Sequence, residues 1–142
     1  MKFIEPFNNK SRKIFTVDQI KAAHSKVKSG ADFPAYIREI KAMGVTHYES
    51  YVIDGHIDYH GSMDYTAKVP AKYEALLIAN STDIEQFKAG LKAHQRAETD
   101  FLSFIRMCAA FGIEKWEVCM DKMTCTYFDK AGNVVLVEGI PY

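Results

Sequence analysis

Two stretches of this sequence repeat each other, and this repeat constrains the fold more than any other feature. When residues 31–49 (ADFPAYIREIKAMGVTHYE) are aligned with residues 99–117 (TDFLSFIRMCAAFGIEKWE), seven of the nineteen positions are identical. Average residue usage gives about one identity by chance. The identical pairs are Asp32/Asp100, Phe33/Phe101, Ile37/Ile105, Arg38/Arg106, Ala42/Ala110, Gly44/Gly112 and Glu49/Glu117. The repeat predicts two copies of one structural unit.

Apolar periodicity predicts the same order of elements in both copies. In the first copy it predicts helices over 16–29 and 32–44, strands over 45–52 and 57–59, a loop over 61–72 and a buried strand over 73–79. Asp32 is expected to cap the second helix, and Asp54-Gly55 to form a hairpin turn. In the second copy it predicts helices over 82–94 and 99–112 and strands over 115–121, 123–128 and 134–138.

These elements predict an α+β fold made of internally duplicated helix-helix-strand-strand-strand units. Four helices are expected to pack on a mostly antiparallel sheet. Residues 1–15 are expected to be an N-terminal arm, and residues 16–142 a single domain with pseudo-repeats at about 16–80 and 82–140. Two units that each cannot bury their own apolar faces are expected to pack around one core by pseudo-twofold symmetry, with a cleft between the halves.

Composition predicts a soluble protein. Among the 142 residues, 18 Lys and Arg balance 18 Asp and Glu, so no broad electrostatic field and no nucleic-acid partner are expected. No membrane partner is expected, since the chain has neither a spanning apolar segment nor the apolar run of a secretory signal. The cysteines Cys108, Cys119 and Cys125 lack CxxC spacing and predict reduced thiols in the cytoplasm, with Cys108 and Cys125 in the core.

One polar motif on an expected strand has the residue types of a metal site. In the string DGHIDYH, the side chains of His56, Asp58 and His60 alternate along the strand and share one face. Two imidazoles and a carboxylate are ligands for zinc or iron, and His47 and Asp64 are further candidates. The alternative interpretation is a solvated sheet face, because the second copy has Thr124, Thr126 and Phe128 at the matching positions.

Two histidines interrupt apolar helical stripes. His24 and His94 are expected either to be edge residues with a hydrogen-bond partner or to form a titratable pair in the cleft between the halves. The sequence contains no GxSxG, P-loop, GxGxxG or HExxH motif, and acidic neighbours of Cys119 disfavour a cysteine nucleophile.

Several long strings resemble a known family in collinear order from about Phe15 to Tyr142. They are QIKAAHSKVKSGADFPAYIREIKAMGV, VIDGHIDYHG, PAKYEAL, FKAGLKAHQ and EKWEVCMDKMTCTYFDKAGNVVLVE. The chain resembles the small bacterial domain-of-unknown-function family labelled phage envelope protein, or phage envelope-like. The resemblance implies a soluble bacterial protein and transfers no catalytic residues.

Three functional hypotheses follow. The preferred one is a non-catalytic binding or interaction protein whose cleft takes a small ligand, or which binds a protein partner or a second copy as a homodimer. The second is a metal-dependent hydrolase in which His56, Asp58 and His60 hold a metal whose bound water is the nucleophile. The third, a virion-associated structural protein, rests on the resemblance alone. The sequence identifies no cofactor.

Overall fold

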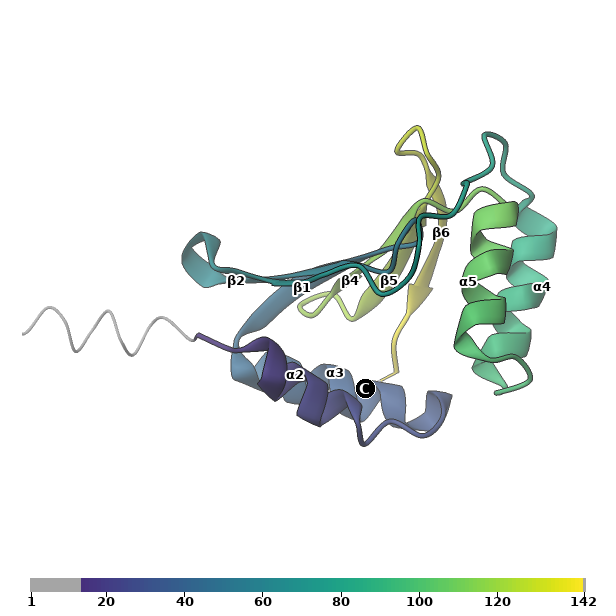
Figure 1. The fold of residues 1–142 in the computed structure, drawn as a ribbon. Coiled ribbons are helices and arrows are strands. Elements are labelled where there is room, and N and C mark those ends of the chain that lie inside the picture. The colour runs from purple at the N-terminus through teal and green to yellow at the C-terminus, as the bar shows by residue number, and fades with distance from the viewer. Residues whose placement is uncertain (1–13, 142) are drawn as a thin grey trace, which may run out of the picture.

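The computed structural model describes residues 14–141, so residues 1–13 of the expected arm lie outside the described part (Figure 1). The first half contains helices α2 (Val17–His24) and α3 (Phe33–Met43), then strands β1 (Val45–Tyr51), β2 (Ile57–Gly61) and β3 (Thr66–Val69). The second half contains α4 (Ile84–Gln95) and α5 (Phe101–Ala110), then β4 (Lys115–Cys119), β5 (Thr124–Phe128) and β6 (Val134–Gly139). Both halves therefore have the predicted order of helices and strands.

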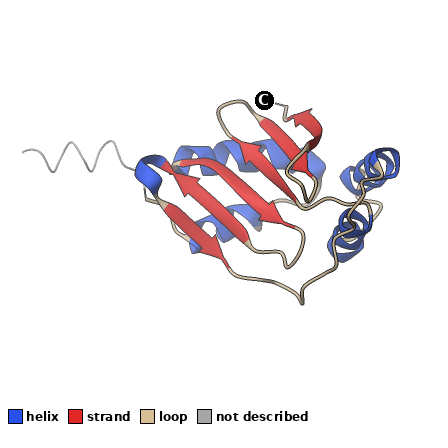
Figure 2. Ribbon diagram, turned by 90° about the horizontal axis from the view of Figure 1, so that it is seen from above, coloured by secondary structure: helices blue, strands red, loops and turns tan. Residues whose placement is uncertain are grey.

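The strands form one six-stranded sheet in the order β3-β2-β1-β4-β5-β6, and every neighbouring pair is antiparallel. The helices leave the outer face of the sheet open, and this face is turned toward the viewer in Figure 2. This arrangement confirms the predicted α+β class. The two halves meet at the β1–β4 pair, where Glu49 is the register partner of Glu117. Descent of the halves from one duplicated unit stays a prediction.

Local signals account for the helix ends. Thr16 and Gln19 form a capping box, in which the Thr16 backbone N–H donates to the Gln19 side chain at 2.8 Å and the Gln19 backbone N–H donates to the Thr16 side chain at 3.1 Å. Gly44 ends α3 in the left-handed region with φ 115°, which glycine adopts without steric cost. The first helix is shorter than predicted: it ends at His24, whereas the sequence pattern predicted residue 29.

The predicted side-chain cap at Asp32 is wrong in detail. Asp32 occupies the N-cap position of α3, but its carboxylate accepts a hydrogen bond from the backbone N–H of Lys28 at 2.9 Å and makes no cap bond. In the second half, Asp83 and Asp100 are the N-cap residues, one position after the expected starts at Thr82 and Thr99. Each accepts from the backbone N–H three residues later, at 3.1 Å and 2.7 Å.

Two element predictions between 61 and 79 are wrong. The expected loop contains edge strand β3, which pairs with β2 and buries Ala67 and Val69. The expected strand over 73–79 is an irregular connection, in which Leu76 N–H donates to Ile53 and Ala79 N–H donates to Ala109. Its backbone is therefore hydrogen-bonded to separate elements rather than along one strand, and Leu77 is 90% exposed.

The core lies between the inner face of the sheet and the four helices, and it draws on both halves. Phe15, which was expected in the arm, is fully buried and packs edge-on against Tyr65. Cys108 and Cys125 are buried free thiols, as predicted. Over residues 14–141, none of the helices has the length and apolar character needed to cross a membrane.

Candidate functional site

Two of the predicted metal ligands, Asp58 and His60, are on β2 and alternate with the buried Tyr59, so they are on the outer face of the sheet. The third, His56, directly precedes β2, and each of the three has its own neighbour. His56 Nδ1 is hydrogen-bonded to the carboxylate of Asp54. His60 Nε2 is hydrogen-bonded to Glu49 on β1 at 2.8 Å. Asp58 is paired with Lys68 on β3 at 3.3 Å.

The three predicted ligands are spread along five residues of extended chain. The rise of an extended strand is about 3.3 Å per residue, so His56 and His60 are separated by about 13 Å along the chain, whereas zinc–nitrogen bonds are about 2.0–2.1 Å long. Among residues 14–141, no group of three or more His, Cys, Asp and Glu side chains is arranged to hold a metal ion. The metal site stays a prediction, and a zinc titration is its test.

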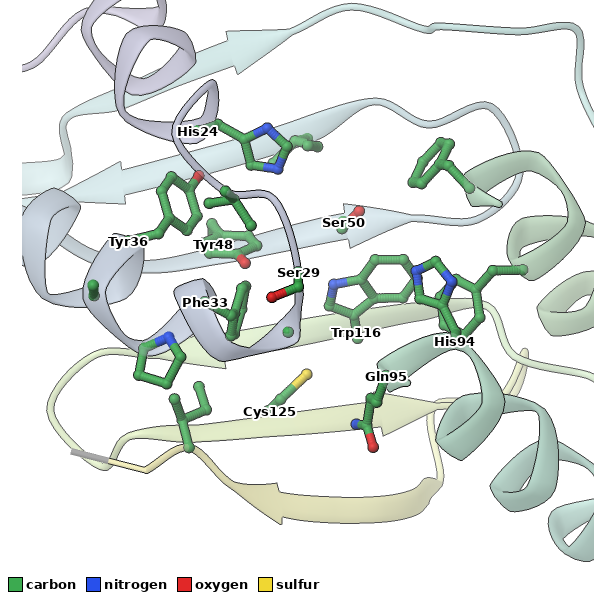
Figure 3. Close-up of a pocket in the computed structure, with 18 of the residues that line it drawn as sticks. His24, Ser29, Phe33, Tyr36, Tyr48, Ser50, His94, Gln95, Trp116 and Cys125 are labelled. Atoms are coloured by element: carbon green, nitrogen blue, oxygen red, sulfur yellow. The ribbon is translucent and has the colours of Figure 1, made fainter. Parts of the chain in front are cut away.

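A cavity of about 1290 Å³ lies on the inner face of the sheet, between the two helix pairs (Figure 3). Its floor contains side chains from both halves of the sheet: Tyr48, Ser50, Ile57, Tyr59, Trp116, Cys125 and Tyr127. Its walls come from α2 and α3 on one side and from α4 and α5 on the other. Both halves therefore contribute lining residues to the cavity, as was expected for a cleft between the halves.

Aromatic rings line both walls. On one side, the ring of His24 lies edge-on to Tyr36 with 5.2 Å between centroids. On the other side, the ring of His94 is stacked on Phe104 at 4.1 Å, and Phe104 lies 5.9 Å from Trp116 on the floor. These surfaces can pack against a flat apolar group.

Hydroxyl groups give the floor and the adjoining α3 wall their polar character. The hydroxyls of Tyr36 and Tyr59 are 3.5 Å apart, and the ring of Tyr48 lies 5.1 Å from that of Tyr59. Burial raises the pKa of all three tyrosines, so these phenols are neutral at pH 7 and can donate or accept hydrogen bonds. Ser50, the buried polar residue of the core, lies beside them on β1.

Cationic groups gather where α2 meets the β3–α4 connection. Lys21, His24 and Lys72 all line the cavity there. Burial, and then the neighbouring charge of Lys21, lower the pKa of Lys72. Burial, and then the charge of Lys72, lower the pKa of His24. The ammonium group of Lys72 also lies 5.9 Å from the ring centroid of Phe101 on α5. Lys72 thus reaches toward both walls.

The structure brings the two unusual histidines to one cavity. His24 and His94 line it from opposite helix pairs, which fits the cleft interpretation (Figure 3). His94 Nδ1 is also within hydrogen-bond distance of Thr99 Oγ1, at 3.1 Å, as expected for an edge residue. Sequence reasoning missed Lys72 and Trp116, because neither stands out in a periodic pattern. The repeat supplied an indirect signal, since it aligns Trp116 with Tyr48 on the floor.

Comparison with known proteins gives a family but no activity. No curated protein matches the chain. The family described as "Protein of unknown function (DUF1398)" matches residues 21–139, which include the last turn of α2, the other three α-helices and all six strands. Nothing in that description links the family to phage envelope proteins. Since the match spans most of the sequence, this chain belongs to the DUF1398 family.

Proposed function

We propose that this protein is a non-catalytic binding protein that holds a small organic molecule in the cavity between its helix pairs. The observation that carries the proposal is the cavity of about 1290 Å³, which has aromatic walls and a hydroxyl-bearing floor. Ligand pockets in proteins are typically concave sites of about 300–1,000 Å³ with mostly apolar walls and a few polar groups. The cavity therefore has room for a drug-sized molecule.

The chemistry of the lining favours binding over catalysis. Burial raises the pKa of Cys125 to about 12, so its thiol is not ionised at neutral pH. Ser50 is the serine on the floor, and the described residues place no histidine in hydrogen-bond contact with it. A serine nucleophile needs such a base.

The cellular setting is part of the same proposal. We place the protein in the bacterial cytoplasm, following the family resemblance and the free thiols of Cys108, Cys119 and Cys125, which suit a reducing compartment. A protein partner or a homodimer is the alternative form of the binding role. The virion-associated role has the resemblance as its sole support, and the hydrolase role depends on the zinc titration.

The sole tryptophan of the chain makes the binding test direct. Trp116 lies on the cavity floor, so a molecule that enters the cavity changes its fluorescence. The neutral probe phenylnaphthylamine is titrated into the protein while tryptophan emission is followed. We expect saturable quenching with energy transfer to the probe.

Two variants on opposite faces of the sheet locate the binding. Ser50→Leu places added volume in the cavity, whereas Thr126→Leu adds the same kind of side chain on the outer face of β5. We expect Ser50→Leu to weaken probe binding by about tenfold or more and Thr126→Leu to leave it unchanged, with circular dichroism confirming that both variants fold. Absence of binding, or equal binding by all three proteins, contradicts the proposal.

A further inference from the structure

The charges that line the cavity are unbalanced. The lining includes four cationic side chains, Lys21, Lys28, Arg38 and Lys72, and one acidic side chain, Glu138. The whole chain has 18 positive and 18 negative side chains, so this excess is local. Glu138 is engaged by Gln95, whose Nε2 donates to it at 3.0 Å.

Lys21 and Lys72 line the same cavity, and neither has an ion-pair partner within residues 14–141. Ion pairs within residues 14–141 use Lys26, Lys68, Arg96 and Lys115, and none includes Lys21 or Lys72. The charge of Lys21 contributes to lowering the pKa of Lys72, after burial, which is the signature of two like charges in proximity. An anion between them relieves this repulsion.

The cationic pair lies beside the aromatic part of the cavity. The Lys72 ammonium group lies 5.9 Å from the ring centroid of Phe101, and Lys72 lines the same cavity as Phe104 and Trp116. The backbone N–H of Lys72 donates to the Asp54 carbonyl at 2.7 Å, so the hairpin turn between β1 and β2 fixes its position. A charged group and an apolar body of one molecule can thus be bound at the same time.

We propose that the ligand is an amphipathic organic anion, whose acidic group is bound between Lys21 and Lys72 while its planar apolar body packs against Phe104 and Trp116. This inference rests on the proposed binding function and specifies its ligand class. A carboxylate and a phosphate ester both satisfy the same two ammonium groups, because lysine binds either as a point charge.

A matched pair of fluorescent probes tests the charge requirement. Anilinonaphthalene sulfonate and phenylnaphthylamine share the same rings, and the first alone carries an anionic group. We expect the sulfonate to bind about tenfold more tightly than the neutral probe, since a charge-assisted contact of about 1.4 kcal/mol corresponds to a factor of ten. Trp116 emission reports both titrations.

Lysine variants identify the anion site. We expect Lys21→Met combined with Lys72→Met to weaken sulfonate binding by about tenfold and to leave the neutral probe within about a factor of two. Lys41→Met is the matched control, since Lys41 is an exposed lysine on α3 that does not line the cavity. It is expected to change neither affinity.

The possible failures are distinguishable. Equal affinities for the two probes, or sulfonate binding that ignores the double lysine variant, overturn the anion inference and leave cavity binding intact. Absence of binding by both probes, or binding that Ser50→Leu does not weaken, overturns the proposed function itself. Competition by naphthoate or naphthyl phosphate, expected for at least one of them, distinguishes a carboxylate from a phosphate, and failure of both contradicts the inference.

Discussion

Glu49 and Glu117 are register partners in the middle of the β1–β4 pair, the strand pair that joins the two halves of the sheet. Like charges directly opposite each other destabilise a sheet. Two contacts of Glu49 offset the repulsion between the two carboxylates. They are a hydrogen bond with His60 at 2.8 Å and one from Lys115 at 3.3 Å. The junction of the halves therefore depends on an ionic network on the outer face.

Replacement of these two glutamates is expected to have unequal effects. Glu49→Gln loses the charge that His60 and Lys115 bind, and we expect the free energy of unfolding to fall by about 1 kcal/mol. Glu117→Gln removes the opposing charge, and we expect it to be neutral or stabilising by up to about 0.5 kcal/mol. Urea unfolding at pH 7 measures both. Equal losses in the two variants contradict this account.

The Glu49 contribution is also expected to depend on pH. Burial alone raises the pKa of Glu49, but the hydrogen bonds from His60 and Lys115 outweigh it, and the pKa is lowered from its usual 4.5. A lowered carboxyl pKa contributes stability that is complete above the unfolded value and is lost as pH falls through the folded value. The difference in stability between the wild type and Glu49→Gln should therefore shrink below about pH 4.5.

Substitution by alanine is expected to reduce stability by different amounts at two glycines that have the same backbone conformation. Gly112 and Gly132 have φ values of 86° and 88°, so a side chain is strained at both positions. A Cβ at Gly112 lies 2.4 Å from the carbonyl oxygen of Ser81, whereas a Cβ at Gly132 has nothing within 4 Å. We expect Gly132→Ala to cost about 1 kcal/mol and Gly112→Ala about 3 kcal/mol or more. Thermal unfolding of both variants tests this, and similar losses contradict it.

His24 predicts a loss of stability at mildly acidic pH. Burial, and then the charge of Lys72, lower its pKa from the usual 6.5, so the unfolded chain binds the proton more tightly than the folded protein. Stability from this group therefore rises with pH between the lowered folded value and 6.5. We expect the wild type to lose slightly more stability than His24→Gln on acidification through this window. The effect is expected to be small, because the burial of His24 is partial and its side chain keeps contact with solvent. A larger loss of stability in His24→Gln than in the wild type contradicts this prediction.

A zinc titration tests the predicted metal site. Because His56, Asp58 and His60 each contact a different neighbour, we expect added zinc not to raise the melting temperature of the wild type. The double variant His56→Ala/His60→Ala is the control for metal binding elsewhere. A zinc-dependent rise that this variant abolishes restores the metal site and, with it, the hydrolase hypothesis.

Sequence patterns predicted the elements that local interactions determine. Gly44 marks the end of α3, and Asp54-Gly55 marks the β1–β2 hairpin, because both positions need backbone conformations that few residues adopt. Strand β3 was missed because a four-residue edge strand depends on its partner β2. The run over 73–79 was misassigned because its burial comes from several elements, which a local apolar pattern does not distinguish from a strand.

The cavity was partly visible in the sequence. His24 and His94 stood out because a histidine on an apolar helical stripe needs an explanation, and both line the cavity. Lys72 did not stand out, since it lies in an irregular connection and a hydrogen bond to Asp54 sets its place. Lys21 did not stand out either, because its relation to Lys72 depends on the tertiary fold.

Helix packing is concentrated within each pair, α2 on α3 and α4 on α5, while the sheet runs continuously beneath the cavity. The pairs approach each other at Gly30, where a Cβ lies 3.0 Å from the carbonyl oxygen of Gln95. The two walls of the cavity are therefore connected through the sheet, whose halves meet at the β1–β4 pair. A molecule in the cavity would contact floor residues of both strands, so we expect slower amide exchange along β1 and β4 when the cavity is occupied.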